Sequence, residues 1–127
     1  MEAHTAEADY DKKIAVLLDY GVYMNAAQKN SENGNLYIAA EQSRTAAREA
    51  RNIGDGELVT QAATEAFQRF LTAAQYPSQF IQSRGTYLQP ATREDCLREA
   101  LFTAQEFGLG EASQLERIKN SLVQKVS

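Results

Sequence analysis

A continuous apolar stripe at helical spacing in residues 57–75 constrains the fold of this chain more than any other feature. Its members recur three and four residues apart, and they are Val59, Ala62, Ala63, Ala66, Phe67, Phe70, Leu71 and Ala74. Such spacing places all of these side chains on one face of an α-helix. Tyr76-Pro77 ends the helix, because proline disfavours helical backbone at the residue before it.

Four further segments show the same periodicity, and no segment alternates strongly between apolar and polar residues. The sequence therefore predicts an all-α fold, a single compact domain of about five helices. The predicted helices other than 57–75 cover residues 8–28, 36–51, 92–107 and 111–126. In the first of them, one face is formed by Ile14, Leu17, Leu18, Gly21 and Met24. Residues 1–7 are small and polar, and we expect them to form a flexible tail.

Turn and capping residues support these boundaries. Gly54 and Gly108 follow predicted helices, at positions where a helix C-cap favours positive φ. Asp55 is a suitable N-cap for the helix that follows it. Thr92 and Asp95 have the spacing of a capping box at the start of the fourth helix.

Residues 76–91 form the longest predicted connection, and long connections are often functional. The segment is polar but carries several aromatic residues, among them Tyr76, Phe80 and Tyr87. Two interpretations stay open. The rings cover the open end of the helix bundle, or they contact a partner protein.

Composition excludes several classes of protein. The chain has 127 residues, with 13 Lys+Arg against 17 Asp+Glu and a formal net charge of −4. This balance argues against a nucleic-acid coat or an electrostatic membrane binder, since both need positive charge to meet phosphate. No apolar run approaches the roughly 20 residues of a membrane span, and no secretory leader is visible. With a single cysteine, no internal disulfide forms, and we expect a cytoplasmic protein.

Few residues are suited to catalysis or to metal binding. The one histidine, His4, lies in the expected tail, and one histidine with one cysteine is too few for a zinc site. We therefore expect no metal and no catalytic residues. A small enzyme that uses the carboxylates Asp95, Glu99 or Glu106 stays an alternative, although a charge-rich helix face is usually just solvated.

An arginine row, defined as Arg44, Arg48 and Arg51, lies on one face of the second predicted helix. Cations near a helix C-terminus are stabilised by the helix dipole, so the row can simply stabilise the helix end. Guanidinium groups also bind carboxylates in bidentate geometry, so the alternative is that the row is a docking site for a ligand or partner. Glu41 and Glu49 are close enough in sequence to neutralise part of it.

Cys96 lies at the edge of the apolar face of the fourth helix. A lone cysteine in a reducing compartment usually behaves as a small buried hydrophobe. The alternative is a thiol at the wall of a pocket, with Arg98 and Glu99 beside it.

The run Leu58-Val59-x-x-Ala62-Ala63-x-x-x-Phe67-x-x-Phe70 resembles the helix before the bilin pocket in phycobiliproteins, the light-harvesting proteins of cyanobacteria. Gly85-Thr86-Tyr87 and Cys96-Leu97-Arg98-Glu99 resemble that family's glycine–tyrosine loop and Cys-x-Arg-Asp motif, with glutamate in place of aspartate. The resemblance covers about residues 36–107. It implies a globin-like or phycobiliprotein-like bundle and an open-chain tetrapyrrole (bilin) as cofactor. Cys96 would attach the bilin, Arg98 would meet a propionate, and Glu99 would bind the pyrrole nitrogens.

Together these observations predict a non-enzymatic helical protein that acts by protein–protein contacts. The resemblance implies a reduced phycobiliprotein or an accessory of the light-harvesting antenna. The alternative is an unrelated helical adaptor that uses the aromatic segment 76–88. In either case we expect a homo- or hetero-oligomer, because alanine-rich helices give a monomer a thin core.

Overall fold

The computed structural model describes residues 2–76, 79–82 and 88–126, and it confirms the all-α class with five helices. The elements in chain order are α1 (Glu2–Glu32), α2 (Leu36–Asn52), α3 (Gly56–Ala73), β1 (Gln79–Gln82), β2 (Leu88–Ala91), α4 (Arg93–Phe107) and α5 (Ala112–Val126). Within these described ranges, no helix combines the length and the apolar character needed to cross a bilayer.

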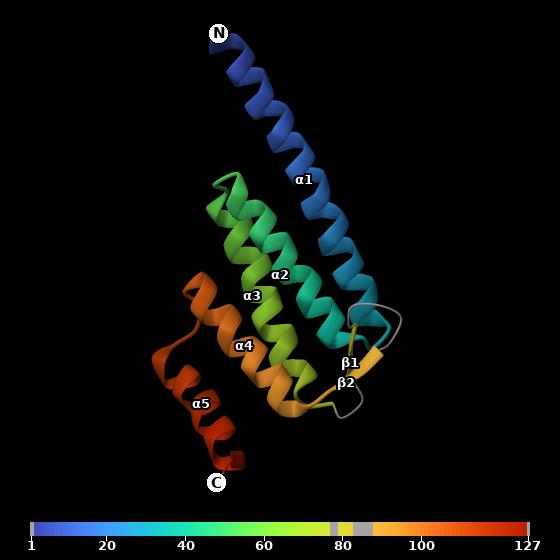
Figure 1. The fold of residues 1–127 in the computed structure, drawn as a ribbon, viewed down its shortest axis with the longest axis vertical. Helices are drawn as coiled ribbons and strands as arrows, with labels where there is room; N and C mark the ends of the chain where they lie inside the picture. The colour runs from blue at the N-terminus through green and yellow to red at the C-terminus, as the bar shows by residue number, and fades with distance from the viewer. Residues whose placement is uncertain (1, 77–78, 83–87, 127) are drawn as a thin grey trace.

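The helices run alternately up and down (Figure 1). α1, α2 and α3 lie side by side, α4 packs against α3, and α5 packs against α4. The N-terminal half of α1 extends past the ends of α2 and α3 (Figure 1). The molecule is therefore a layered bundle with one helix end that no other helix covers.

The capping residues act as the sequence predicts. The Asp55 side chain accepts a hydrogen bond from the backbone N–H of Leu58. Thr92 and Asp95 form a complete capping box, in which each side chain accepts from the other residue's backbone N–H at 3.0 Å. Gly108 ends α4 with φ of 67°, in the left-handed region that favours glycine.

Two groups of buried residues hold the helices together. Small side chains of α2 and α3 allow close approach of the two helices, and Ala46, Ala47, Ala62 and Ala63 are fully buried there. Larger residues fill the space between α2, α3, α4 and α5, and they surround Phe70. Tyr37 meets the Phe70 ring edge to face, with centroids 5.2 Å apart.

α1 differs from the sequence-based expectation in two respects. It begins at Glu2, so residues 2–7 continue the helix where a tail was expected. The face marked by Ile14, Leu17 and Leu18 is exposed, whereas Val16 and Ala27 are buried against the bundle. Periodicity identifies a helix face, but which of two apolar faces is covered depends on the neighbouring helices.

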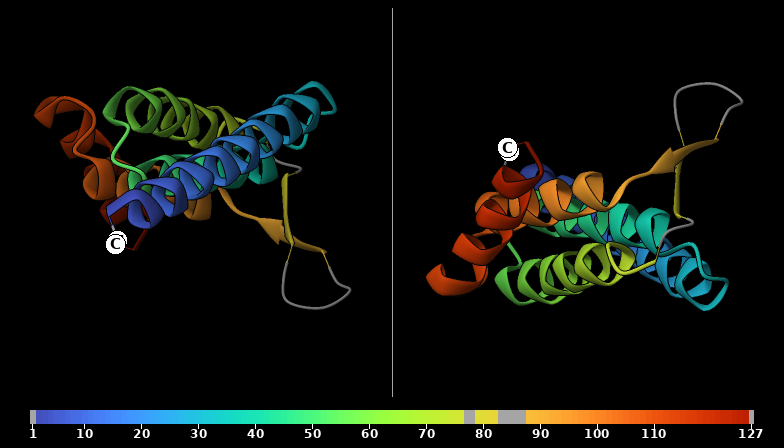
Figure 2. Two further views of the ribbon diagram at one scale, coloured as in Figure 1. Left: turned by 90° about the horizontal axis from the view of Figure 1, so that it is seen from above. Right: turned by 90° about the horizontal axis from the view of Figure 1, so that it is seen from below.

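The connection after α3 contains a two-stranded antiparallel hairpin where a loop was expected. Gln79 pairs with Ala91, and Gln82 pairs with Leu88. Figure 2 shows β1 and β2 to one side of the helices. Both strands are four residues long, too short for period-two alternation to stand out in the sequence. Pro90 lies in β2, at the edge position that a strand proline requires.

Candidate functional site

Arg44 joins three helices. From α2, its Nη1 donates to Glu99 Oε2 at 2.6 Å and to Thr103 Oγ1 at 3.3 Å, both on α4. Its guanidinium carbon lies 4.9 Å from the centre of the Phe70 ring on α3. Thr103 is fully buried, and its hydroxyl donates to the Glu99 carbonyl oxygen at 2.8 Å. We call these four residues the Arg44 cluster.

The rest of the arginine row contacts Glu106 on α4. Arg48 donates to both carboxylate oxygens, at 2.9 and 2.7 Å, and Arg51 lies 3.1 Å from Oε2. Arg51 also lies over the Phe107 ring, 5.1 Å from its centre. The hydrogen bond from Arg48 is the main reason that the pKa of Glu106 is lowered from its usual 4.5.

The arginine row thus binds carboxylates, but they belong to the same chain. The sequence suggested Glu41 and Glu49 as neutralising groups, whereas the observed partners are Glu99 and Glu106, more than fifty residues away. Arg44, Arg48 and Arg51 therefore fix α4 against α2 in this structure. A separate ligand carboxylate would have to displace one of these ion pairs.

The residues expected to hold a bilin, Cys96, Arg98 and Glu99, lie in three different settings. Cys96 is 1% exposed within the core, and burial raises the pKa of its thiol to about 11. Glu99 is held by Arg44, and Arg98 is on the surface, 3.3 Å from Asp95. A thiol must be accessible and ionised to attach a cofactor. These residues, as folded, do not fit a bilin, and the bilin site stays a prediction of the resemblance alone.

The three candidate catalytic carboxylates all have arginine partners. Asp95 closes the capping box and contacts Arg98, while Glu99 and Glu106 bind the arginine row. Burial raises the pKa of a fourth carboxylate, Glu41, which sequence reasoning did not select. The described residues bring together no group of three or more His, Cys, Asp and Glu that could hold a metal.

The aromatic segment is only partly described. The Tyr76 side chain is 55% exposed. Phe80 lies on β1 with its backbone opposite Pro90, but its side chain is outside what the structure describes. Tyr87 also lies outside the described residues. Of this segment, Tyr76 is the ring seen at the surface.

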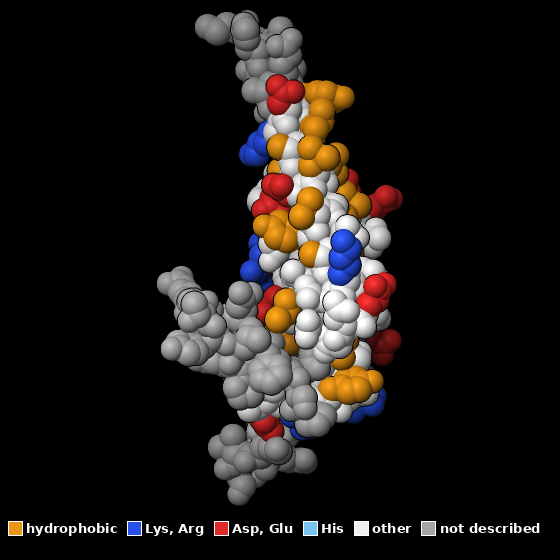
Figure 3. Space-filling view, turned by 90° about the vertical axis from the view of Figure 1, so that its right-hand side faces the viewer, with side chains coloured by type: hydrophobic (Ala, Val, Ile, Leu, Met, Phe, Trp, Pro, Cys, Tyr) orange, Lys and Arg blue, Asp and Glu red, His pale blue; other side chains and the backbone are white. Residues whose placement is uncertain are grey.

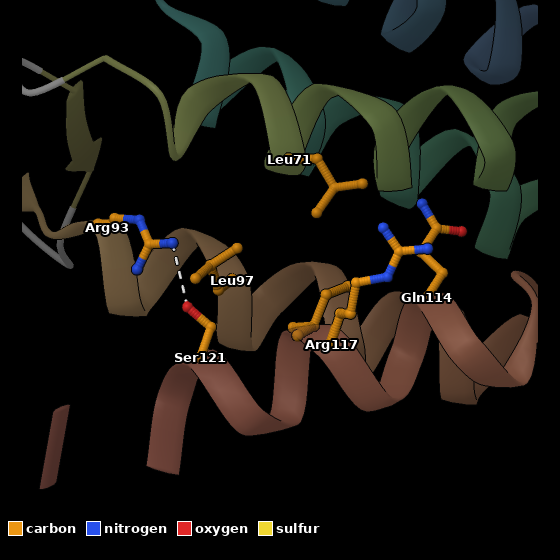
Figure 4. Close-up of a pocket in the computed structure, with 7 residues that line it drawn as sticks. Leu71, Arg93, Leu97, Gln114, Arg117 and Ser121 are labelled. Carbon is orange, nitrogen blue, oxygen red and sulfur yellow. Dashed lines mark hydrogen bonds between the residues drawn. The ribbon is translucent and has the colours of Figure 1, made fainter. Parts of the chain in front are cut away.

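A small pocket of about 190 Å³ lies between α3, α4 and α5 (Figure 4). Its apolar lining is Leu71, Leu97 and Ile118. Arg93 and Arg117 also line it, and Arg93 donates to Ser121 Oγ at 3.0 Å. Neither arginine has an ion-pair partner among the residues that the structure describes. The pocket is smaller than the roughly 300 Å³ at which small-molecule sites begin, and it suits a single side chain.

Among the described residues, five of the eight large apolar residues that are exposed lie on α1, on what we call its outer face. We define it by Tyr10, Ile14, Leu17, Leu18 and Val22, which are 41–66% exposed. Figure 3 faces the side on which α1 lies, and below the grey N-terminal residues it shows hydrophobic side chains with charged side chains among them. These residues lie on the side of α1 turned away from Val16 and Ala27, which contact the bundle. Such patches on soluble proteins commonly mark interaction sites.

Sequence reasoning missed the exposure of this face and the pairing of the arginine row. The spacing of Ile14, Leu17 and Leu18 was visible, but a monomer core explains it equally well. A second apolar set on α1, formed by Val16, Tyr20, Met24 and Ala27, is the signal that could have separated inner from outer face. Arg93 and Arg117 are 24 residues apart in sequence, and no local pattern connects them.

Comparison with protein-family models, with curated proteins and with solved structures finds no match for this chain. The resemblance to phycobiliproteins therefore stays a prediction. The residues and their geometry alone carry the functional argument.

The Glu106 pair predicts a pH dependence of stability. The pKa of Glu106 is lower in the folded chain than in the unfolded chain. Its contribution to stability is therefore complete above the usual pKa of 4.5 and is lost as the pH falls through the folded pKa. We expect Glu106→Gln to reduce the loss of unfolding free energy between pH 5 and pH 3, measured by urea denaturation.

The control is Glu116→Gln, an exposed change on α5 at a residue without an ion pair among the described residues. It should leave the dependence of unfolding free energy on pH as in the wild type. Equal slopes for wild type and Glu106→Gln would contradict the assignment.

The burial of Cys96 predicts that its thiol reacts slowly with reagents in solution. With its pKa near 11 and 1% exposure, the native side chain should react with a chromogenic disulfide at pH 8 far more slowly than the urea-unfolded chain. We expect a rate ratio of at least about a hundredfold. Comparable rates would show that the thiol opens to solvent, and would restore Cys96 as a candidate attachment site.

Proposed function

We propose that this chain is a non-enzymatic helical protein that acts by protein–protein contact through the outer face of α1. The observation that carries the proposal is the exposure of five large apolar side chains in one stripe on a helix that extends past the bundle. Exposing apolar surface to water is unfavourable, so a partner that covers this surface would lower the free energy of the system.

Charge and chemistry support a contact function. Of the candidate catalytic carboxylates, Glu99 and Glu106 are bound by the arginine row, and Asp95 is bound by Arg98 and the capping box, so all three have structural roles within the chain. The formal charge of −4 favours a protein partner over nucleic acid. An antenna protein, the partner that the resemblance implies, would meet the same α1 face. An adaptor that works through the aromatic segment would use Tyr76 instead.

Photo-crosslinking distinguishes these surfaces. A photoreactive amino acid replaces Leu18 on α1, Tyr76 before the hairpin, or Val123 on α5 in separate variants, expressed in the cells of origin. The three positions have similar exposure, at 66%, 55% and 64%. We expect a protein adduct from position 18 and none from position 123. An adduct from position 76 alone would favour the adaptor, and no adduct at position 18 would contradict the proposal.

A further inference from the structure

We infer that the outer face of α1 is covered by a second copy of this chain, bound antiparallel to the first. This inference rests on the proposed function and names its partner. Two observations support it: the spacing of the apolar residues and the glycine among them.

The spacing is that of a helix–helix seam. Tyr10, Ile14, Leu17 and Gly21 follow one another at steps of four, three and four residues. Over these four positions the alternation matches a heptad seam, and it ends at Gly21, because the next heptad position, Met24, packs against the core between α2 and α3. Leu18 and Val22 flank the seam, and both are 66% exposed. The charged residues Lys12 and Asp19 fall outside the seam positions.

Gly21 has no evident role within one copy. Its φ is not positive, and a Cβ built on it would meet nothing within 4 Å. Glycine inside a helix destabilises it relative to alanine, so a monomer would be more stable with alanine here. Glycine is useful where another chain must approach the helix closely. Gly21 lies on the exposed seam, which indicates such an approach from outside.

An antiparallel pair satisfies both observations. A two-fold axis perpendicular to the two helices crosses the pair between Ala15 and Val16. Tyr10 of one copy then lies opposite Gly21 of the other. The same axis sets Ile14 opposite Leu17. The largest seam side chain then meets the residue that has none, and two aliphatic side chains of similar size meet each other. A parallel pair would oppose Tyr10 to Tyr10 and leave a gap between the two Gly21 residues. The contact is isologous and closes after two copies.

The area and the position of the face allow such a pair. At roughly 150–200 Å² for a fully exposed large side chain, the five outer-face residues present roughly 500 Å². A standard interface takes about 800 Å² from each partner, and flanking polar side chains of α1 can supply the remainder. Val16 and Ala27 are buried against the bundle, and they lie roughly 120° around α1 from the seam. The bundle therefore flanks the seam and leaves it uncovered.

Light scattering and a spin-label distance test this inference. We expect a mass twice that of the 14.1-kDa chain at micromolar concentration. A nitroxide on Glu32→Cys, at the end of α1, should then give a label-to-label distance of about 50 Å, from 33 residues at about 1.5 Å each. A parallel pair would give a distance below roughly 25 Å, since paired helix axes lie about 8–10 Å apart. The short distance would overturn the antiparallel arrangement, and a monomer would overturn the second copy.

Two variants test the residues. Leu18→Glu should abolish the pair, whereas the matched control Val123→Glu, at an equally exposed site on α5, should leave it intact. Gly21→Ala should raise the thermal midpoint of the monomeric Leu18→Glu protein and weaken the wild-type pair about tenfold. A tighter pair with Gly21→Ala would overturn the placement of Tyr10 over Gly21. A monomer whose Leu18 photo-adduct contains a different protein would overturn the second copy and leave the proposed function standing, whereas the absence of any adduct would overturn both.

Discussion

The position of α4 depends on the guanidinium of Arg44. The Arg44 side chain is 13% exposed, and its guanidinium is in contact with a carboxylate, a buried hydroxyl and an aromatic ring that come from two other helices. A charge that is so little hydrated must be paired, because an unpaired buried cation costs several kcal/mol. Glu99 and Thr103 supply the pairing, so α4 is held at the register where both reach Arg44. Glu106 extends the same contact toward Arg48 and Arg51.

Because these charged groups pair with one another within the chain, the molecule has two distinct regions, a packed core and the exposed outer face of α1. In α2, α3 and α4, small alanine faces bring backbones close, and the arginine row binds the carboxylates of α4. The inner side of α1 completes this core through Val16 and Ala27. Its outer side has neither ion pairs nor cover in the part of the chain that the structure describes. Contact with another protein is the function that this division supports best.

Much of the fold could be predicted from local patterns, whereas most of the site could not. Helical periodicity and caps such as Asp55 and Thr92 depend on neighbours within a few residues, and the structure confirms them. The partners of the arginine row lie more than fifty residues away, so their identity depends on how helices pack. The same holds for Cys96, whose burial is a property of the assembled core. The hairpin and the outward direction of Leu18 were missed because the strands are short and because α1 carries two apolar faces.

A double-mutant cycle between Arg44 and Glu99 tests the central claim most directly. The unfolding free energies of wild type, Arg44→Met, Glu99→Gln and the double variant give the coupling between the two side chains. If the Arg44 cluster holds α4 in place, the coupling should be about 1–3 kcal/mol. The losses of unfolding free energy in the two single variants should then add up to more than the loss in the double variant. A coupling near zero, with both single variants close to wild type, would show that α4 is held by apolar contacts alone and would contradict the account.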